Sequence, residues 1–72
     1  MKIYAYIPRE DGTTPVGTIG VCLFERKTEA GAIRTARDRL QHEIGYKERG
    51  IVVQSYTNLY NDDTFRTIYE GK

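Results

Sequence analysis

The sequence predicts an α+β domain in which strands and a helix follow the order ββαββ. Two observations support this prediction. Strand-forming residues alternate in four short segments, and one segment between the second and the third has apolar residues at helical spacing. Because one helix can cover one face of a sheet, we expect a single antiparallel-rich four-stranded sheet with the helix packed on one face. A chain of 72 residues has room for one hydrophobic core, so we expect one domain over residues 1–72.

The first two strands are expected at residues 2–7 and 18–26. Their sequences, KIYAYI and TIGVCLFER, are both rich in residues that favour strands. Residues 8–17 hold both prolines of the chain and predict a loop that is longer than a tight hairpin turn. We expect the two strands to pair antiparallel across this loop.

The helix is expected at residues 28–44. Thr28 is suited to cap its first turn, and Glu29 places a carboxylate near the positive end of the helix dipole. Gly45 is a typical residue just beyond the end of a helix. Apolar residues follow one another at spacings of three and four and form one stripe: Ile33, Ala36, Leu40 and Ile44.

The last two strands are expected at residues 51–57, IVVQSYT, and 64–69, TFRTIY. Asparagine and aspartate in residues 58–63 favour a turn, so these two strands should form a hairpin. Residues 45–50, GYKERG, are polar and predict a loop between the helix and the third strand.

Strand alternation divides the side chains between two faces of the sheet. The face under the helix is expected to carry the aliphatic sets of the first two strands: Ile3, Ala5, Ile7, Ile19, Val21 and Leu23. The opposite face, which we call the open face, is expected to be aromatic with basic and amide groups around it. Its expected members are Lys2, Tyr4, Tyr6, Cys22, Phe24, Arg26, Gln54, Tyr56 and Arg66, joined by Val52 and Ile68 from the mixed last strands.

Three interpretations of the open face remain. Tyrosine favours strands and tolerates half-exposure, so the face can be a simple sheet surface. It can instead be a protein interface or a self-association surface, because Tyr, Phe and Arg are common at interfaces. It can also stack the bases of single-stranded nucleic acid. The net charge of +1 disfavours nucleic acid, since such domains are usually clearly basic.

The helix offers a second candidate surface. Arg34, Arg37 and Gln41 lie three and four residues apart, away from the apolar stripe, with Lys27 near the start. Residues 26–49 contain seven basic and four acidic side chains, a local balance of +3. This surface is either a solvated face with an Arg34–Asp38 pair or a contact for an acidic protein or a phosphate backbone.

No catalytic or metal site is expected. Cys22 lies in a strand and His42, the only histidine, near the end of the helix, so neither a nucleophile–base pair nor a zinc site is indicated. Residues 61–63, NDD, lack the spacing of a calcium loop. We therefore expect a protein that is not an enzyme and that binds no cofactor.

The expected location is the cytoplasm. A single cysteine cannot form an intramolecular disulfide, as small secreted proteins commonly do. The N-terminal residues resemble a strand and not a signal peptide. No stretch approaches the ~20 apolar residues of a membrane span, so no membrane partner is expected.

The sequence therefore predicts a small protein-binding module. The size, the lack of an active site and the aromatic face suggest an inhibitor from a phage or mobile element that occludes a surface of host machinery, such as a defence system. The alternatives are a single-stranded nucleic-acid-binding domain and a homodimer that buries the open face. The expected binding residues are Tyr4, Tyr6, Phe24, Tyr56 and Arg66, with Arg34 and Arg37 as a second patch.

Overall fold

The computed structural model describes residues 1–12 and 20–71. In chain order the elements are β1 (Lys2–Tyr6), β2 (Val21–Glu25), α1 (Glu29–Leu40), α2 (Tyr46–Arg49), β3 (Ile51–Tyr56), the 3-10 turn η1 (Asp62–Thr64) and β4 (Arg66–Gly71). The predicted α+β class and the order ββαββ are confirmed. The structure also contains α2, a single helical turn in the segment that the sequence predicts to be a loop. Gly45 and Gly50 flank it with φ of 86° and 71°, a left-handed backbone that favours glycine.

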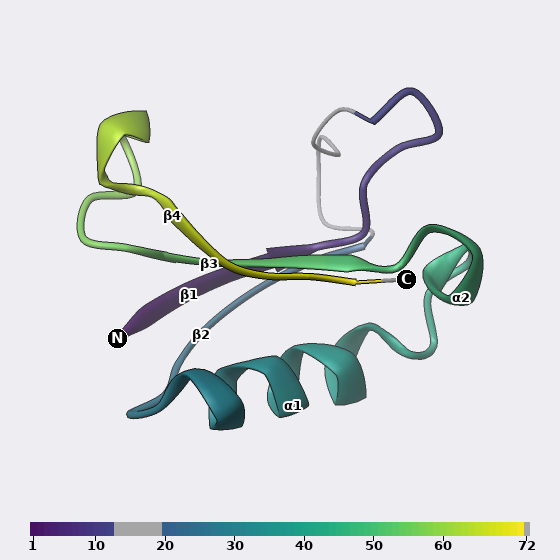
Figure 1. The fold of residues 1–72 in the computed structure, drawn as a ribbon, viewed down its shortest axis with the longest axis horizontal. Coiled ribbons are helices and arrows are strands. Elements are labelled where there is room, and N and C mark those ends of the chain that lie inside the picture. Colours follow the sequence, from purple (N-terminus) through teal and green to yellow (C-terminus); the bar gives the residue numbers. More distant parts are fainter. Residues whose placement is uncertain (13–19, 72) are drawn as a thin grey trace.

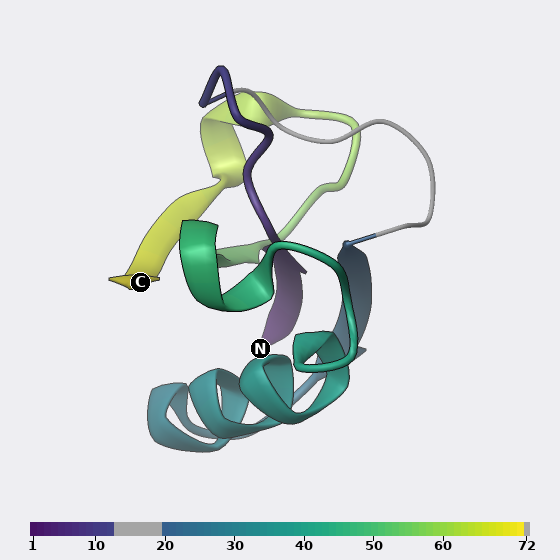
Figure 2. The same cartoon turned by 90° about the vertical axis from the view of Figure 1, so that its right-hand side faces the viewer.

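The strands form one sheet in the order β2-β1-β3-β4, and every neighbouring pair is antiparallel. β1 and β3 are therefore the central strands, and β2 and β4 are the edges. Figure 1 shows α1 along one face of the sheet. On the other face, the β3–β4 connection and residues 8–12 rise from opposite ends (Figure 1). The view in Figure 2 also places α1 on a single side of the sheet, as the sequence predicts.

The hydrophobic core lies between α1 and the helix-facing side of the sheet. In β1 the alternation is regular, because Ile3 and Ala5 are fully buried and Tyr4 between them is half-exposed. The other buried members of the cluster are Ile7, Ala32, Ala36, Leu40, Ile51 and Val53. Small alanine side chains on α1 allow the helix to approach the sheet closely, so the aliphatic side chains of β1 and β3 fill the layer.

The orientation of β2 differs from the prediction. Ile3 pairs with Phe24 and Tyr4 with Leu23, and residues directly opposite each other share a face. Phe24 therefore lies on the helix side, and Leu23 lies on the open face. The pattern could not decide this, because β2 has apolar residues on both faces. The guanidinium groups of Arg39 and Arg26 lie 5.1 and 5.3 Å from the Phe24 ring centre and cover it. The predicted core residue Ile19 lies outside the described residues.

α1 ends about one turn earlier than predicted. Thr28 caps its start as expected, accepting a hydrogen bond from the Gly31 amide at 3.1 Å. At the other end Leu40 is 2 % exposed, whereas Ile44 is 93 % exposed. Tyr46 of α2 packs against the buried cluster beyond Leu40. We infer that this tyrosine takes the place in the core that the stripe predicts for Ile44.

A β-bulge separates the two halves of β4. Val53 pairs with Tyr69 but Gln54 pairs with Thr67, which leaves Ile68 as the extra residue. Both Ile68 and Tyr69 consequently pack against the helix-side core. Arg66 lies opposite Ser55, whose other neighbour is the buried Ile3, so Arg66 also belongs to the helix side. The expectation that Arg66 and Ile68 lie on the open face is wrong, because a bulge interrupts the simple alternation on which it depends.

Candidate binding site

Four aromatic rings form one cluster on the open face: Tyr4, Tyr6, Tyr56 and Phe65. The rings of Tyr56 and Phe65 stack with centroids 5.0 Å apart and an interplanar angle of 16°. Phe65 meets Tyr4 edge-on at 5.8 Å, and Tyr4 lies 5.5 Å from Tyr6. We call these four residues the aromatic cluster. The predicted positions of the three tyrosines on the open face are confirmed by the register of β1 and β3.

Phe65 is the member that sequence reasoning missed. It directly precedes β4, and the expected alternation of that strand places it under the helix. Because Arg66 lies on the helix side, the preceding residue points the other way and joins the tyrosines. The Tyr4 ring is partly buried, and this burial, with a smaller contribution from Tyr6, raises the pKa of the Tyr4 phenol above its ordinary value of 10.0. The cluster is thus a packed layer and not a row of separate rings.

Exposed apolar side chains gather at one end of the sheet. Among the described residues, the large apolar side chains that are exposed are Met1, Leu23, Ile44, Leu59 and Tyr60. All except Ile44 line two adjoining hollows where β1 begins and β3 ends. We call Met1, Leu23, Leu59 and Tyr60 the apolar rim. The two hollows share Lys2, Glu25, Tyr56 and Thr57, so the rim surrounds one member of the aromatic cluster.

The loop that carries half of the rim is held by its own side chains. The Asn58 side chain accepts a hydrogen bond from the Tyr60 amide at 3.0 Å, and the Asn61 side chain accepts one from the Asp63 amide at 3.0 Å. The Thr64 hydroxyl lies 2.9 Å from the Asn58 carbonyl and closes the loop. Tyr60 is nevertheless 95 % exposed. A large apolar side chain is therefore presented to solvent from an ordered turn.

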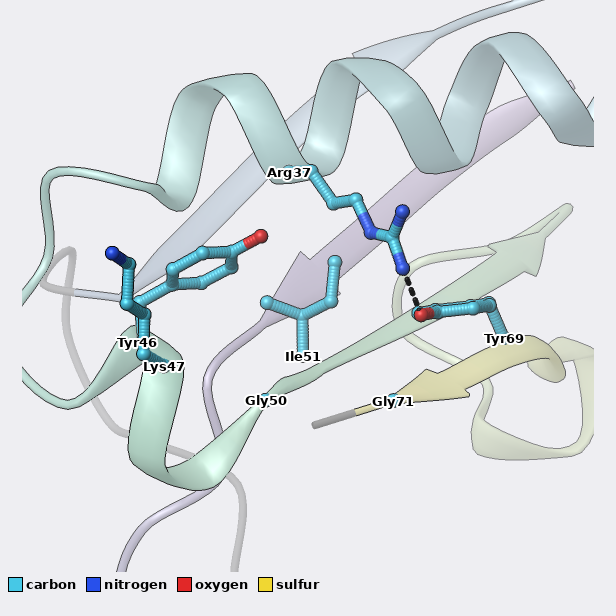
Figure 3. A pocket seen from close by; sticks show the side chains of 7 residues that line it. All are labelled: Arg37, Tyr46, Lys47, Gly50, Ile51, Tyr69 and Gly71. Atoms are coloured by element: carbon cyan, nitrogen blue, oxygen red, sulfur yellow. Dashed lines mark hydrogen bonds between the residues drawn. The ribbon is translucent and has the colours of Figure 1, made fainter.

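The basic residues of α1 lie on the other side of the molecule. Arg37 donates a hydrogen bond to the Tyr69 hydroxyl, and its guanidinium carbon lies 5.0 Å from the centre of the Tyr69 ring. Figure 3 shows this pair on one side of Ile51, with the Tyr46 ring on the other side of a pocket. The pocket is lined by Arg37, Tyr46, Lys47, Gly50, Ile51, Tyr69 and Gly71. Through these contacts with Tyr69, Arg37 connects α1 to the edge strand β4.

The predicted binding residues are therefore divided among different places. Tyr4, Tyr6 and Tyr56 lie together in the aromatic cluster. Phe24 and Arg66 lie on the helix side of the sheet, although Arg66 lines one of the two hollows at the rim and Phe24 lines the other. Arg34 is exposed on α1, outside the residues that line the pocket of Arg37.

Cys22 is half-buried on the helix side of β2. Burial raises the pKa of its thiol above the ordinary value of 9.0, and the positive charge of Arg39 offsets part of that effect. His42 is exposed after the end of α1. In residues 1–12 and 20–71, no group of three or more His, Cys, Asp or Glu side chains is placed to hold a metal ion. Within the same ranges, no helix is long and apolar enough to cross a membrane.

The raised pKa of the Cys22 thiol predicts how its reactivity depends on pH. Because the thiolate is the reactive form, we expect the rate of Cys22 modification by DTNB to rise at higher pH in the folded protein than in the protein unfolded by urea. The raised pKa also means that the stabilisation from this group is complete below pH 9.0 and is lost as the pH rises through the folded-state pKa. Coincident pH–rate profiles in the two states would contradict the burial of Cys22.

Comparisons of the chain with protein-family models, with curated proteins and with solved structures found no match. A function is therefore inferred from the two surfaces described above, namely the rim with its aromatic cluster and the pocket of Arg37.

Proposed function

We propose that the chain is a non-enzymatic protein-binding module whose contact surface is the apolar rim with the aromatic cluster beside it. The observation that supports this most is the gathering of exposed apolar side chains: of the five large and exposed ones in residues 1–12 and 20–71, four line the two adjoining hollows. Scattered apolar residues are normal on protein surfaces, but a contiguous patch usually marks an interaction site.

The composition of this surface suits a protein partner. Tyr56 and Tyr60 offer large, fairly rigid contact areas, and tyrosine is enriched among residues that dominate binding energy. Lys2 and Glu25 border the same hollows and supply opposite charges at the margin, as the polar edge of an interface does. Because the loop that holds Tyr60 is ordered by its own hydrogen bonds, binding loses less conformational entropy than an unstructured loop would.

Binding of single-stranded nucleic acid agrees less well with the geometry. Base stacking needs exposed ring faces, but Phe65 covers one face of Tyr56 at 5.0 Å. A nucleic-acid surface also needs cations beside the aromatic residues. Lys2 and Arg66 line the hollow around Tyr56, but Glu25 lines it too, and Arg34 and Arg37 lie on α1, which covers the opposite side of the sheet (Figure 1). These observations favour a protein partner over a nucleic acid.

We propose that the module acts by covering a surface of its partner. For a domain of this size this is the simplest way to inhibit, because steric occlusion requires no chemistry. Origin in a phage or mobile element, a target in host defence and a location in the cytoplasm stay predictions.

The test is an affinity capture with the tagged protein from a lysate of the organism that encodes it. We expect a protein captured in stoichiometric amount whose recovery is unchanged when nuclease is added. Recovery that disappears with nuclease would replace the proposed partner with nucleic acid. A titration with single-stranded oligonucleotides at low salt provides the second readout, and we expect no quenching of tyrosine fluorescence.

A further inference from the structure

The hydrogen bonds between β1 and β2 show which backbone groups of β2 point away from the sheet. The Met1 amino group donates to the Arg26 carbonyl at 2.7 Å, and the Arg26 amide donates to the Met1 carbonyl at 3.1 Å. Further along, the Ile7 amide donates to the Gly20 carbonyl at 2.8 Å. In an antiparallel pair, residues that bond to the neighbour alternate with residues that do not. The even-numbered residues of β2 thus bond to β1, and the amides and carbonyls of Val21, Leu23 and Glu25 point outward. The Glu25 carbonyl also accepts a hydrogen bond from the Arg26 guanidinium at 2.6 Å, which leaves its second lone pair for a neighbouring strand.

The two edges of the sheet differ in how well they are protected. The β-bulge at Ile68 interrupts β4, and such irregularities hinder the addition of another strand. β2, VCLFE, has no proline, no lysine and an unbroken register with β1. Its middle residue, Leu23, is 49 % exposed. Of the two edges that the structure describes, β2 is therefore the one suited to pairing with another strand.

We propose that β2 pairs antiparallel with β2 of a second copy of this chain, about a two-fold axis at Leu23. This register uses every outward-pointing residue of the strand, since Leu23 faces Leu23 of the other copy and Val21 faces Glu25. It brings no like charges of β2 itself opposite each other, although Arg26 and Arg39, which lie over Phe24, approach those of the other copy on the helix side. On the helix side, Cys22 faces Phe24 of the other copy. Two sheets become one continuous sheet, with both α1 helices on one side and both aromatic clusters on the other.

The charge pattern selects this register over its neighbours. A shift of the pairing toward the C-terminal end of β2 moves Glu25 toward Glu25 of the other copy, and like charges directly opposite each other are destabilising. A one-residue slip would place inward-pointing amides at the interface and leave them unpaired. A five-residue strand buries little area compared with the ~800 Å² per partner of a stable interface. We therefore expect a weak dimer that dissociates on dilution.

This pairing shares Leu23 with the apolar rim but differs from the proposed partner contact in the groups that it uses. It uses the backbone of β2, whereas the rim residues Leu59 and Tyr60 lie in the β3–β4 connection. The Leu23 side chains stay on the open face and lie side by side across the axis. Each dimer therefore presents the Leu23 side chains of both copies on the open face of one sheet.

Cysteine cross-linking tests the pairing and its register. In a Cys22→Ser background, Leu23→Cys places two thiols opposite each other, with Cα atoms about 5.5 Å apart, within the range that a disulfide spans. We expect diamide to convert this variant to a covalent dimer at high protein concentration. Glu25→Cys in the same background is the matched control. It lies on the same strand and face but about 13 Å from its counterpart, so it should stay monomeric.

Sedimentation equilibrium gives the second measurement. We expect the unmodified protein to shift from monomer to dimer as its concentration increases to the millimolar range. Leu23→Lys, which places two charges at the axis, should abolish this shift, and Thr67→Lys on the bulged edge should preserve it. Circular dichroism checks that both variants fold. A monomer at every concentration, or equal cross-linking of the Leu23→Cys and Glu25→Cys variants, would overturn the proposal.

Discussion

Truncation of Leu40 to alanine should lower the free energy of unfolding by about 2–5 kcal/mol, because it leaves a cavity in the core. Leu40 is 2 % exposed and lies at the end of α1, where the helix meets the buried side chains of the sheet. Domains of this size are usually near the low end of the ~5–15 kcal/mol range of folding stability. The variant should therefore unfold at much lower denaturant concentration, or be largely unfolded at room temperature.

Ile44→Ala is the matched control for this prediction. Both residues belong to the apolar stripe that the sequence predicts, but Ile44 is 93 % exposed and should change the free energy of unfolding by less than about 0.5 kcal/mol. Urea unfolding followed by circular dichroism measures both values. Similar losses for the two variants would mean that α1 extends to Ile44, as the sequence pattern predicts, and would contradict the observed end of the helix.

β1 could be predicted from the sequence because it is a central strand with distinct faces. Its odd-numbered residues are aliphatic and buried, and the even-numbered ones are polar or aromatic and remain accessible. An edge strand is under weaker constraint, and β2 has large apolar residues on both faces. The choice between Leu23 and Phe24 depends on the ring's contacts with Arg26 and Arg39. Arg39 comes from α1, a contact that strand alternation does not consider.

The early end of α1 and the bulge of β4 differ from the prediction for the same kind of reason. The apolar spacing continues to Ile44, but Tyr46 packs against the core in the following helical turn. In β4, the bulge lets Ile68 and Tyr69 both contact the core, which a strict period of two forbids. In both places a tertiary contact overrides a local pattern, so the pattern identified the element correctly but placed its side chains wrongly.

The candidate surface was predictable only in part. Tyr4, Tyr6 and Tyr56 follow from strand alternation, and the structure places them together. The rim was missed, although one signal was available. Leu59 and Tyr60 are large apolar residues within a turn rich in asparagine and aspartate, where polar residues are the usual choice. Apolar residues in such a turn either fold back onto the core or remain accessible for a partner, and Tyr60 is 95 % exposed.

Replacement of Leu59 and Tyr60 by serine should weaken binding of the captured partner by about thirtyfold or more, equivalent to about 2 kcal/mol. The physical reason is that both side chains lose apolar contact area at the hollow around Tyr56. Because Leu59 is 38 % and Tyr60 95 % exposed, their loss should change the folding stability far less than it changes binding. Isothermal titration calorimetry with the purified partner measures the affinity.

Ile44→Ser is the control, since it removes an exposed apolar side chain of similar size that lies away from both hollows. It should leave the affinity unchanged. Equal losses for the rim variant and for Ile44→Ser would show that general surface hydrophobicity, and not the rim, drives association. Unchanged affinity for the rim variant would contradict the proposed surface. The opposite side of the molecule, where Arg37 meets Tyr69, would then be the remaining candidate, and Arg37→Gln would test it against Arg34→Gln on the same helix.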